Sequence, residues 1–401
     1  MGIINIVIMK AKFLSFKSGV GDCLFLELNQ DGEKYSIMVD CHEFAPDIEN
    51  YVFTELEKHI NLLIVTHIDK DHVCGITQML TKHPDLIVDK IIFNCFQVVG
   101  DTNTELPDED KKILEELNKI PTRSNVVSSQ ISVPQAASLA KTILKNEAWG
   151  CVWEKQPTTS SSADLELGEN SKWGCIKWLS PTQKVLDKLY NTEFKKTYNR
   201  YFHKLPPEGG FKQQEEVFEV LIKLDDIVNK SRQKGNTKIA SVKLCASLFE
   251  RLKDERVDER TVSISNCSSL AFEWKCGEKS VLFLGDALSS QVESALKEAY
   301  DNIQKYDVIK VSHHGSAYST TSSLYAFIDA PCYFVSGGNN NDKPSAEALS
   351  KILCRKTSGG NRRLYFSNPS NKVVKWLLSD EARVLRDKYN FSLEESNEIE
   401  F

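Results

Sequence analysis

The stretch LLIVTHIDKDHVCG, residues 62–75, decides how the chain is interpreted. It opens with four apolar residues, which predict a buried strand ending near Thr66. From Val73 onward the apolar residues have the spacing of a helix. The polar side chains between strand and helix therefore lie on a loop at a strand end, a place where binding and catalytic groups are common.

That loop carries two imidazoles and two carboxylates within six positions: His67, Asp69, Asp71 and His72. Packed into one turn, such groups would repel one another or lie unsatisfied unless a cation sat among them. The spacing therefore predicts a metal site. The alternative is a polar loop in which Asp71 caps the following helix.

The H-x-D-x-D-H pattern resembles the H-x-H-x-D-H signature of the metallo-β-lactamase superfamily, with Asp69 in the place of the second His. The variant is similar to that of the nuclease domain of ComEC-type DNA-uptake proteins and their soluble relatives. Three more stretches agree with this resemblance, namely FKSGVGD at 16–22, LFLGD at 282–286 and KVSHHGS at 310–316. The resemblance covers residues 11–94 and 261–366 and leaves the middle of the chain unmatched.

The resemblance implies an α/β fold of the αββα type, in which two mixed sheets pack together and helices cover both outer faces. We expect one metallo-β-lactamase-like domain over residues 1–400, with its core at 10–180 and 261–378. The charged segment 181–260 is expected to be a mostly helical insertion, and 379–401 a C-terminal tail.

Apolar runs bounded by turn residues predict the strands of both halves. In the first half they lie at 12–16, 23–28, 35–39 and 87–93. In the second half they lie at 261–264, 269–276, 280–284, 307–311, 333–336, 364–366 and 372–376.

The resemblance also implies a ligand set for two metal ions. His67 and Asp69 would hold the first ion, Asp71 and His72 the second, and Asp286 would bridge them. In such sites the ions lie about 3.5 to 4 Å apart, share a hydroxide whose pKa they lower, and stabilise the attacked and leaving oxygens. A ligand set this rich in carboxylate favours Mn²⁺ or Mg²⁺, and Zn²⁺ remains an alternative.

The motif around His313 and His314 supplies the last ligands. Two adjacent histidines point in different directions, so the sequence leaves open which of them ligates. With the resemblance, Asp71 and His314 are the candidate catalytic residues. Gly315 is expected to let the backbone approach the metals, and Ser316 to bond the loop or a substrate oxygen.

Two further carboxylates are expected to support the ligands from behind. Asp22 ends the glycine-rich turn of the first matched stretch, and Asp40 stands at a strand end. The alternative for Asp40 is to cap a helix at 45–59. Cys74 lies beside the metal motif but is interpreted as a thiol buried by the helix. His203 is the one histidine placed where the superfamily has a central ligand.

The stretch NNNDKP at 339–344 resembles a late N-x-x-x-H-P loop of the family, but Lys343 stands where a histidine is usual. Lys343 would bind a phosphate as a point charge, or it is a surface lysine. Asn341 of the same loop is a further candidate for substrate contact.

Composition sets the remaining bounds. The chain has 401 residues, of which 41% are hydrophobic and 26% charged, as in a globular protein. No apolar run approaches the roughly 18 residues of a membrane span, and no export signal is evident, so we expect a cytoplasmic protein without a membrane partner. Eleven cysteines without a C-x-x-C pair are typical of a reducing compartment. A net charge of −6 argues against a general nucleic-acid surface.

The metal-site residues and the resemblance together leave three possible functions. The first is a metal-dependent hydrolase with a dinuclear centre, a phosphodiesterase or nuclease acting on nucleic acid, a nucleotide or another anionic substrate. The second is an amide or ester hydrolase, or a peptidase component of a bacterial antiviral defence operon. The third is a non-catalytic scaffold with a vestigial metal site, in which residues 181–260 bind a protein partner.

Overall fold

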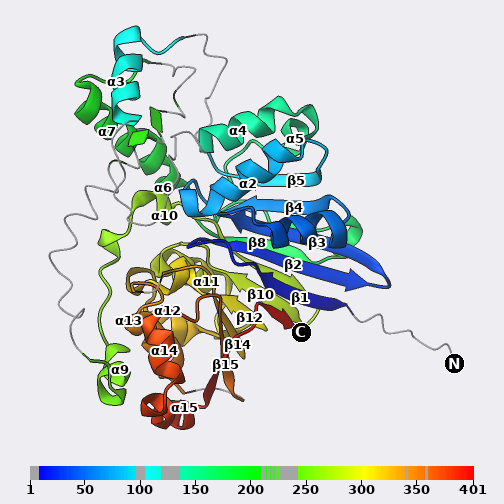
Figure 1. The fold of residues 1–401 in the computed structure, drawn as a ribbon, viewed down its shortest axis with the longest axis vertical. Helices are drawn as coiled ribbons and strands as arrows, with labels where there is room; N and C mark the ends of the chain where they lie inside the picture. Colours follow the sequence, from blue (N-terminus) through cyan, green and yellow to red (C-terminus); the bar gives the residue numbers. More distant parts are fainter. Residues whose placement is uncertain are drawn as a thin grey trace.

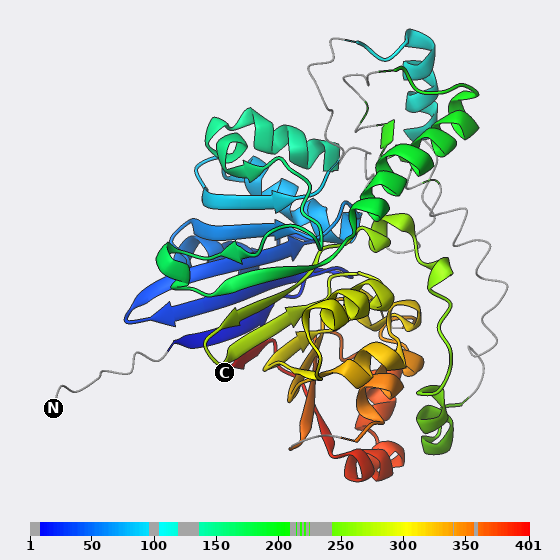
Figure 2. The same cartoon turned by 180° about the vertical axis from the view of Figure 1, so that it is seen from behind.

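Two large sheets pack face to face between two layers of helices in the computed structural model (Figures 1 and 2). The structure describes residues 9–95, 104–118, 136–208, 243–339, 341–356 and 360–401, with single positions between 208 and 243. The αββα sandwich expected from the sequence is confirmed.

The first sheet has seven strands in the order β17-β1-β2-β3-β4-β5-β6. Neighbours from β17 to β3 run antiparallel, and those from β3 to β6 run parallel. Its strands are β1 (Lys10–Ser15), β2 (Cys23–Gln30), β3 (Glu33–Cys41), β4 (His59–Val65), β5 (Ile87–Phe93), β6 (Trp153–Glu154) and β17 (Glu398–Glu400).

The second sheet has eight strands in the order β16-β15-β14-β12-β10-β9-β8-β7. It is parallel from β16 to β10 and antiparallel from β10 to β7, so it combines the two kinds of pairing as the first sheet does. Its strands are β7 (Leu165–Glu166), β8 (Cys175–Ser180), β9 (Ala271–Cys276), β10 (Lys279–Phe283), β12 (Val308–Lys310), β14 (Cys332–Val335), β15 (Arg362–Phe366) and β16 (Phe391–Glu394).

The core between the sheets consists of apolar side chains that alternate along the strands. Phe13 of β1 packs against Phe283 of β10 and Phe334 of β14, with ring centroids 5.6 and 5.3 Å apart. Burial of these faces from water is the main stabilising contribution to the sandwich.

Helices cover the outer face of each sheet. On the first sheet lie α1 (Pro46–Asn50), η1 (Tyr51–Glu55), α2 (Lys70–Lys82), α4 (Ala136–Lys145) and α5 (Glu147–Val152). On the second sheet lie α9 (Ala246–Leu252), α11 (Ser289–Ala299), α12 (Ser322–Phe327), α13 (Ala346–Leu353), α14 (Lys372–Leu378) and α15 (Arg383–Tyr389).

The expected insertion begins as a continuous helical segment formed by α6 (Gln183–Asp187), η3 (Lys188–Glu193) and α7 (Phe194–Phe202). It packs with α3 (Asp108–Asn118), to which Tyr198 donates a hydrogen bond at Asp110 (2.9 Å). At its other end, α9 belongs to the helical layer of the second sheet, where Phe249 is fully buried. Figure 1 shows the two parts at opposite ends of the molecule.

Two predicted strands are wrong. Residues 261–264 end a 3-10 turn, η4 (Glu259–Thr261), and start the short helix α10 (Ile264–Cys267), which Ser263 caps. Residues 372–376 lie in α14, because the side chain of Asn371 accepts hydrogen bonds from the N–H groups of Val373 and Val374. The buried apolar residues there, Val373, Val374 and Leu377, have the spacing of one face of a helix and not the alternation of a strand.

The segment 379–401, expected as a tail, is instead part of both sheets. Its strand β16 pairs with β15, and its strand β17 pairs with β1. Ile399 is buried in the core between the sheets. The last strand thus closes the edge of the first sheet beside β1 (Figure 1).

Candidate metal centre

The expected metal ligands come together at the carboxyl ends of strands from both sheets. The loop after β4 carries His67 and leads into α2, which begins at Lys70. Asp286 follows β10, and His313 and His314 follow β12. Side chains far apart in the sequence therefore converge where the two sheets meet. Sites at the carboxyl ends of parallel strands are common in α/β folds.

The capping alternative for the first loop is not observed. The N-cap of α2 is Asp69, whose side chain makes no capping hydrogen bond, and Asp71 lies within the first turn. The two carboxylates remain 21% and 31% exposed. Both carboxylates are therefore accessible and can bind a metal ion or another group that enters the site.

Four buried polar atoms at this place have no hydrogen-bond partner among the described residues: His67 Nε2, His72 Nε2, His314 Nε2 and Asp286 Oδ1. His72 Nε2 lies 3.6 Å from Asp286 Oδ1. The ring centroids of His67 and His72 are 4.2 Å apart, and those of His72 and His314 are 5.7 Å apart. Because an unsatisfied buried polar atom costs about 1 to 3 kcal/mol, four that face one another indicate a missing common partner.

The hydrogen bonds behind these rings fix which nitrogen faces the centre. His72 Nδ1 donates to Asp40 Oδ2 at 2.7 Å, and His314 Nδ1 donates to the carbonyl of Ser336 at 3.0 Å. His67 Nδ1 lies 3.0 Å from the Thr66 hydroxyl. Each Nε2 is then free to offer a lone pair, which is the tautomer that a metal ion requires.

Three groups of side chains among the described residues share His72, and in one of them, with Asp22 and Asp40, its partners lie behind the ring; the other two face the centre. One consists of His67, His72 and Asp286, and the other of Asp71, His72 and His314. Within each group the ligand atoms lie within 4.8 Å of one another. The donor set, imidazole nitrogen with carboxylate oxygen, suits a divalent metal ion in each of the two groups that face the centre.

The two remaining expected ligands flank these groups. Asp69 Oδ2 lies 3.6 Å from His67 Nε2. His313 Nε2 lies 3.4 Å from Asp286 Oδ2, but the same ring also contacts Asn266 at 3.0 Å and Ser319 at 3.2 Å. Of the two adjacent histidines, only His314 belongs to a clustered ligand group of the described residues.

Asp40 is fully buried and organises the first loop. It accepts the backbone N–H of Thr66 and the Thr66 hydroxyl, both at 2.7 Å, in addition to His72. Asp40 therefore lies behind His72 and Thr66, on the side away from the centre, and the alternative that it caps a helix is not observed.

Asp22 supports the other side of the centre. Its Oδ1 accepts a hydrogen bond from Ser336 at 2.6 Å and lies 3.2 Å from His314 Nδ1. Its Oδ2 forms an ion pair with Lys310, which also donates to the carbonyl of Gly285 at 3.0 Å. Lys310 is 1% exposed and ties three loops of the site together.

The charges around the two central histidines favour positive charge there. Burial lowers the pKa of His72, but Asp40, Asp286 and Asp71 outweigh it and leave that pKa well above its ordinary value. For His314 burial acts in the same direction, and nearby carboxylates again raise the pKa, to about 9. Protons or metal ions can supply the positive charge that this cluster attracts.

The glycine-rich turn is required by a close approach. A Cβ on Gly21 would lie 1.9 Å from the carbonyl oxygen of Asp71, so only glycine lets the two loops meet. Gly315 has a φ of +78°, and its Cβ would lie 2.7 Å from Pro344. Gly315 therefore packs against the loop before α13, and this contact is a sufficient reason for glycine there.

The three expected substrate-binding residues differ in their positions. Ser316 is buried, and its hydroxyl accepts the N–H of Tyr318 at 3.3 Å, so it bonds the loop. Asn341 is exposed, and its N–H donates to Asn339 at 2.9 Å. Lys343 is half-buried and acts on the site through its charge: burial and the Lys343 ammonium together hold the pKa of His313 well below its ordinary value.

Two residues that the sequence analysis set apart, Cys74 and His203, belong to no clustered ligand group of the described residues, and one residue near the centre was missed. Cys74 is buried in α2, as expected. His203 is exposed, adopts a left-handed conformation that ends α7, and belongs to no clustered ligand group of the described residues. Lys310 is the first residue of the matched stretch KVSHHGS, but its role beside Asp22 was missed, because a lysine within a strand is ordinarily a solvent-facing residue.

No protein-family model matches this chain, and no curated protein matches it significantly. Three solved structures are similar over nearly all of the chain. A mutant of the β-hydroxylase CmlA has 12% identity and a TM-score of 0.36, covering 97% of this chain and 53% of its own, so this chain spans about half of that protein. The metallo-β-lactamase fold protein YhfI from Bacillus subtilis has 10% identity and a TM-score of 0.36, covering 98% of this chain and 100% of its own.

The third solved structure is a diphosphatase from the PhnP family, with 9% identity and a TM-score of 0.37, covering 99% of this chain and 98% of its own. Similarities at this level do not transfer an activity.

Proposed function

We propose that this chain is a metal-dependent hydrolase of the metallo-β-lactamase type that cleaves phosphodiester bonds in a nucleic acid or nucleotide. The observation that carries the proposal is the set of four buried, unpartnered atoms on His67, His72, His314 and Asp286. A vestigial site would be expected to lose such costly groups or to satisfy them within the protein.

In this proposal His67, Asp69 and Asp286 would hold one ion, Asp71 and His314 would hold the other, and His72, which belongs to both groups, is assigned to the second. When bound, the ions supply a water of lowered pKa and charge stabilisation for the attacked and leaving oxygens. The high proportion of carboxylate favours Mn²⁺ or Mg²⁺, with Zn²⁺ as the alternative.

The residues behind the ligands keep them in the binding-competent state. Asp40 holds His72 and, through Thr66, also His67, so that one buried carboxylate orients two imidazoles. Asp22 and Ser336 do the same for His314. The ligand rings thus need little reorganisation when metal binds.

A phosphodiester is proposed as the substrate for two reasons. The first is the resemblance of the H-x-D-x-D-H and H-H-G-S motifs to those of ComEC-type nucleases, which is an argument by analogy. The second is Lys343, whose charge acts on His313 next to Asp286. An ammonium at this place adds attraction for a phosphate without needing a bidentate geometry.

The helical segment after residue 181 is proposed to shape the mouth of the site or to bind a protein partner. The Tyr190 hydroxyl of η3 donates to the carbonyl of Asn94, directly after β5, at 3.0 Å. The same element contacts α10, which contains the His313 neighbour Asn266. The segment therefore begins at the edge of the sheets that carries the ligands.

A deletion tests this role, and α9 limits its extent. Because Phe249 and Leu252 are buried against the second sheet, removal of α9 would damage the core. Val217, Phe218, Leu221 and Leu224 are also buried in the core, so the deletion must leave them in place. Replacing residues 225–242 by a short Gly/Ser bridge should keep metal binding and change substrate preference or partner binding. Unchanged values for both would reject the proposal for this segment.

A cytoplasmic location is proposed from the thiols. Seven of the eleven cysteines are buried: Cys23, Cys41, Cys74, Cys95, Cys267, Cys332 and Cys354. Buried thiols in this number suit a reducing compartment. Among the described helices, none has the length and apolar character of a membrane span.

The activity is tested with protein stripped of metal by a chelator and then given Mn²⁺, Mg²⁺ or Zn²⁺. The substrates are bis-p-nitrophenyl phosphate, DNA, RNA and cyclic dinucleotides, beside p-nitrophenyl acetate and a β-lactam. We expect metal-dependent hydrolysis of the phosphodiesters. Hydrolysis of the ester or lactam alone would support an amide or ester hydrolase, and undiminished phosphodiester hydrolysis in excess EDTA would refute a metal mechanism.

A further inference from the structure

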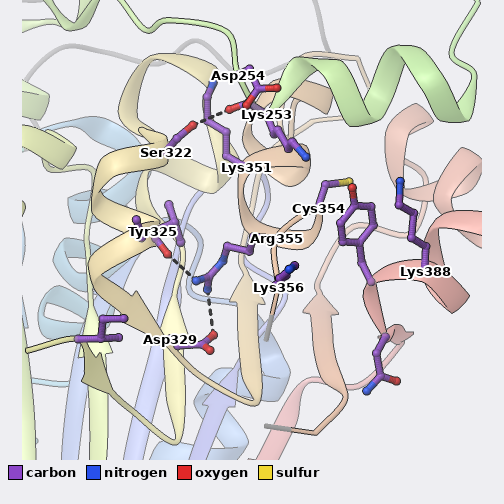
Figure 3. Close-up of a pocket in the computed structure, with 14 residues that line it drawn as sticks. Lys253, Asp254, Ser322, Tyr325, Asp329, Lys351, Cys354, Arg355, Lys356 and Lys388 are labelled. Atoms are coloured by element: carbon purple, nitrogen blue, oxygen red, sulfur yellow. Dashed lines mark hydrogen bonds and ion pairs between the residues drawn. The ribbon is translucent and has the colours of Figure 1, made fainter. Parts of the chain in front are cut away.

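A pocket of about 790 Å³ lies beside the helices that cover the second sheet, and Figure 3 shows the side chains that line it. Asp329 and Arg355, which line it, precede β14 and β15, whereas the metal ligands follow β10 and β12. Its walls come from α12, from the ends of α9, α13 and α15, and from the loops beside them. The pocket is therefore separate from the proposed active site.

The pocket is cationic in a chain whose net charge is −6. Two carboxylates line it, those of Asp254 and Asp329. Five cationic side chains line it: Lys253, Lys351, Arg355, Lys356 and Lys388.

Two of these cations are engaged by the protein. Arg355 donates to Asp329 at 3.0 Å and to the carbonyl of Ile328 at 3.1 Å, as Figure 3 shows for the carboxylate. Lys388 forms an ion pair with Glu250 at 2.6 Å. These two groups have structural partners and are not available as the main ligands of an anion.

Lys351 has no such partner. It is only 4% exposed, and its ammonium forms no hydrogen bond or ion pair with any residue that the structure describes. Burial lowers the pKa of Lys351 from its ordinary value, and the charges of Glu347 and Glu255 oppose this effect. The ammonium itself is not one of the fully buried atoms, and Lys351 lines the pocket, so a charged group that enters the pocket can supply the counter-charge that the described residues do not.

The wall around Lys351 holds further unsatisfied groups. The hydroxyl of Tyr325 is buried and has no hydrogen-bond partner among the described residues. Lys253 contacts the ring of Tyr389 at 5.6 Å but forms no ion pair with a described residue. An ammonium and a hydroxyl in one wall can both donate to an oxyanion.

We propose that this pocket binds a small molecule that carries a phosphate group, with Lys351 and Lys253 as its principal ligands. Two ammonium groups match a doubly charged phosphate as point charges, whereas the fork that favours a planar carboxylate, Arg355, is already occupied. The volume admits a free phosphate or a mononucleotide.

The binding experiment uses the full chain with two probes, inorganic phosphate and AMP, at constant ionic strength. Wild-type protein should show saturable binding by calorimetry and a rise of at least about 2 °C in its unfolding midpoint. Lys351→Met and Lys253→Met should each weaken binding by about tenfold or more, because each removes a charged contact. Preference for AMP would identify a nucleotide, and equal affinity the phosphate group alone.

The control variant is Lys145→Met, which removes an exposed lysine from the last turn of α4, outside the pocket. It should bind both probes like the wild type. If neither probe binds, or if Lys351→Met binds as well as Lys145→Met does, the lysines only complement the negative ends of α9, α13 and α15, and the proposal is wrong.

Discussion

Charged side chains gather at both ends of the strands of the second sheet, and they are held differently at the two ends. The end that carries the metal centre is called the carboxyl edge here, and the end that carries the pocket is called the amino edge. At the carboxyl edge, the back of each central imidazole is fixed, as His72 is by Asp40 and His314 by Ser336. At the amino edge, the Lys351 ammonium has no partner among the described residues. The side chains at the carboxyl edge are therefore fixed in one arrangement, whereas those at the amino edge would act mainly through their charge. Single substitutions should be far more damaging at the carboxyl edge.

The largest expected effect is at the centre of the carboxyl edge. Asp286→Ala should lower hydrolysis by about a thousandfold or more, because it removes metal-binding charge where several kcal/mol of transition-state stabilisation arise. Elemental analysis should show a reduced metal content, while circular dichroism remains that of the wild type. The matched control is Asp301→Ala, an exposed carboxylate that should change neither value. Full metal content in Asp286→Ala would contradict its role as a ligand.

One layer behind the ligands the effect should be smaller. Asp40→Asn keeps an acceptor for Thr66 but removes the negatively charged partner of the His72 ring. Metal affinity should therefore fall by about 10- to 100-fold. Competition with a chromogenic chelator measures this. Asp329→Asn, the same change at the other edge, should leave metal affinity unaltered, and an equal loss in both variants would mean that the two edges do not differ.

The next prediction concerns the charge of the Lys343 ammonium beside the site. Lys343→Ala should lower kcat/KM for an anionic phosphodiester by about five- to a hundredfold, the equivalent of one charge contact of about 1 to 3 kcal/mol. A neutral ester, if it is hydrolysed at all, should be affected little. Equal losses for both kinds of substrate would show that Lys343 supports the loop and does not attract the phosphate.

The smallest expected effect concerns stability at the amino edge. Although burial alone would raise it, Arg355 and Arg362 hold the pKa of Asp329 below its ordinary value. The stabilisation is therefore complete above the unfolded pKa of about 3.9 and is lost as the pH falls through the lower folded value. Asp329→Asn should lower the free energy of unfolding by about 1 to 3 kcal/mol at pH 7.

Denaturant unfolding of both proteins across pH 2 to 7 measures this difference, which should narrow below about pH 4. A difference that is constant over this range would show that the charge of Asp329 does not contribute.

The sequence predicted the part of the site that is continuous in the chain. The run from His67 to His72 lies between a strand and a helix whose apolar patterns are local. The order of the remaining motifs predicted the two-sheet fold. The sequence did not indicate that Lys310 would pair with Asp22, because the two residues are brought together only by the packing of both sheets.

The errors have a similar cause. The run at 372–376 is apolar in a way that fits a strand or a buried helix equally, and the capping residue Asn371 was the local signal that distinguished them. The strands at 391–394 and 398–400 are short, and the second carries two glutamates. Their pairing depends on partners in β15 and β1 that local patterns do not reveal.

The pairing of the first described strand with the last has a consequence for how the protein is made. During synthesis β1 emerges early, yet its outer edge stays open until β17 is available. An open edge can pair with another chain, and contacts between such distant segments form slowly. Once in place, β17 presents a short edge, and its Glu398 is paired with Lys12 at 2.7 Å. Loss of the last few residues should therefore appear first as aggregation during expression, before it appears as lost activity.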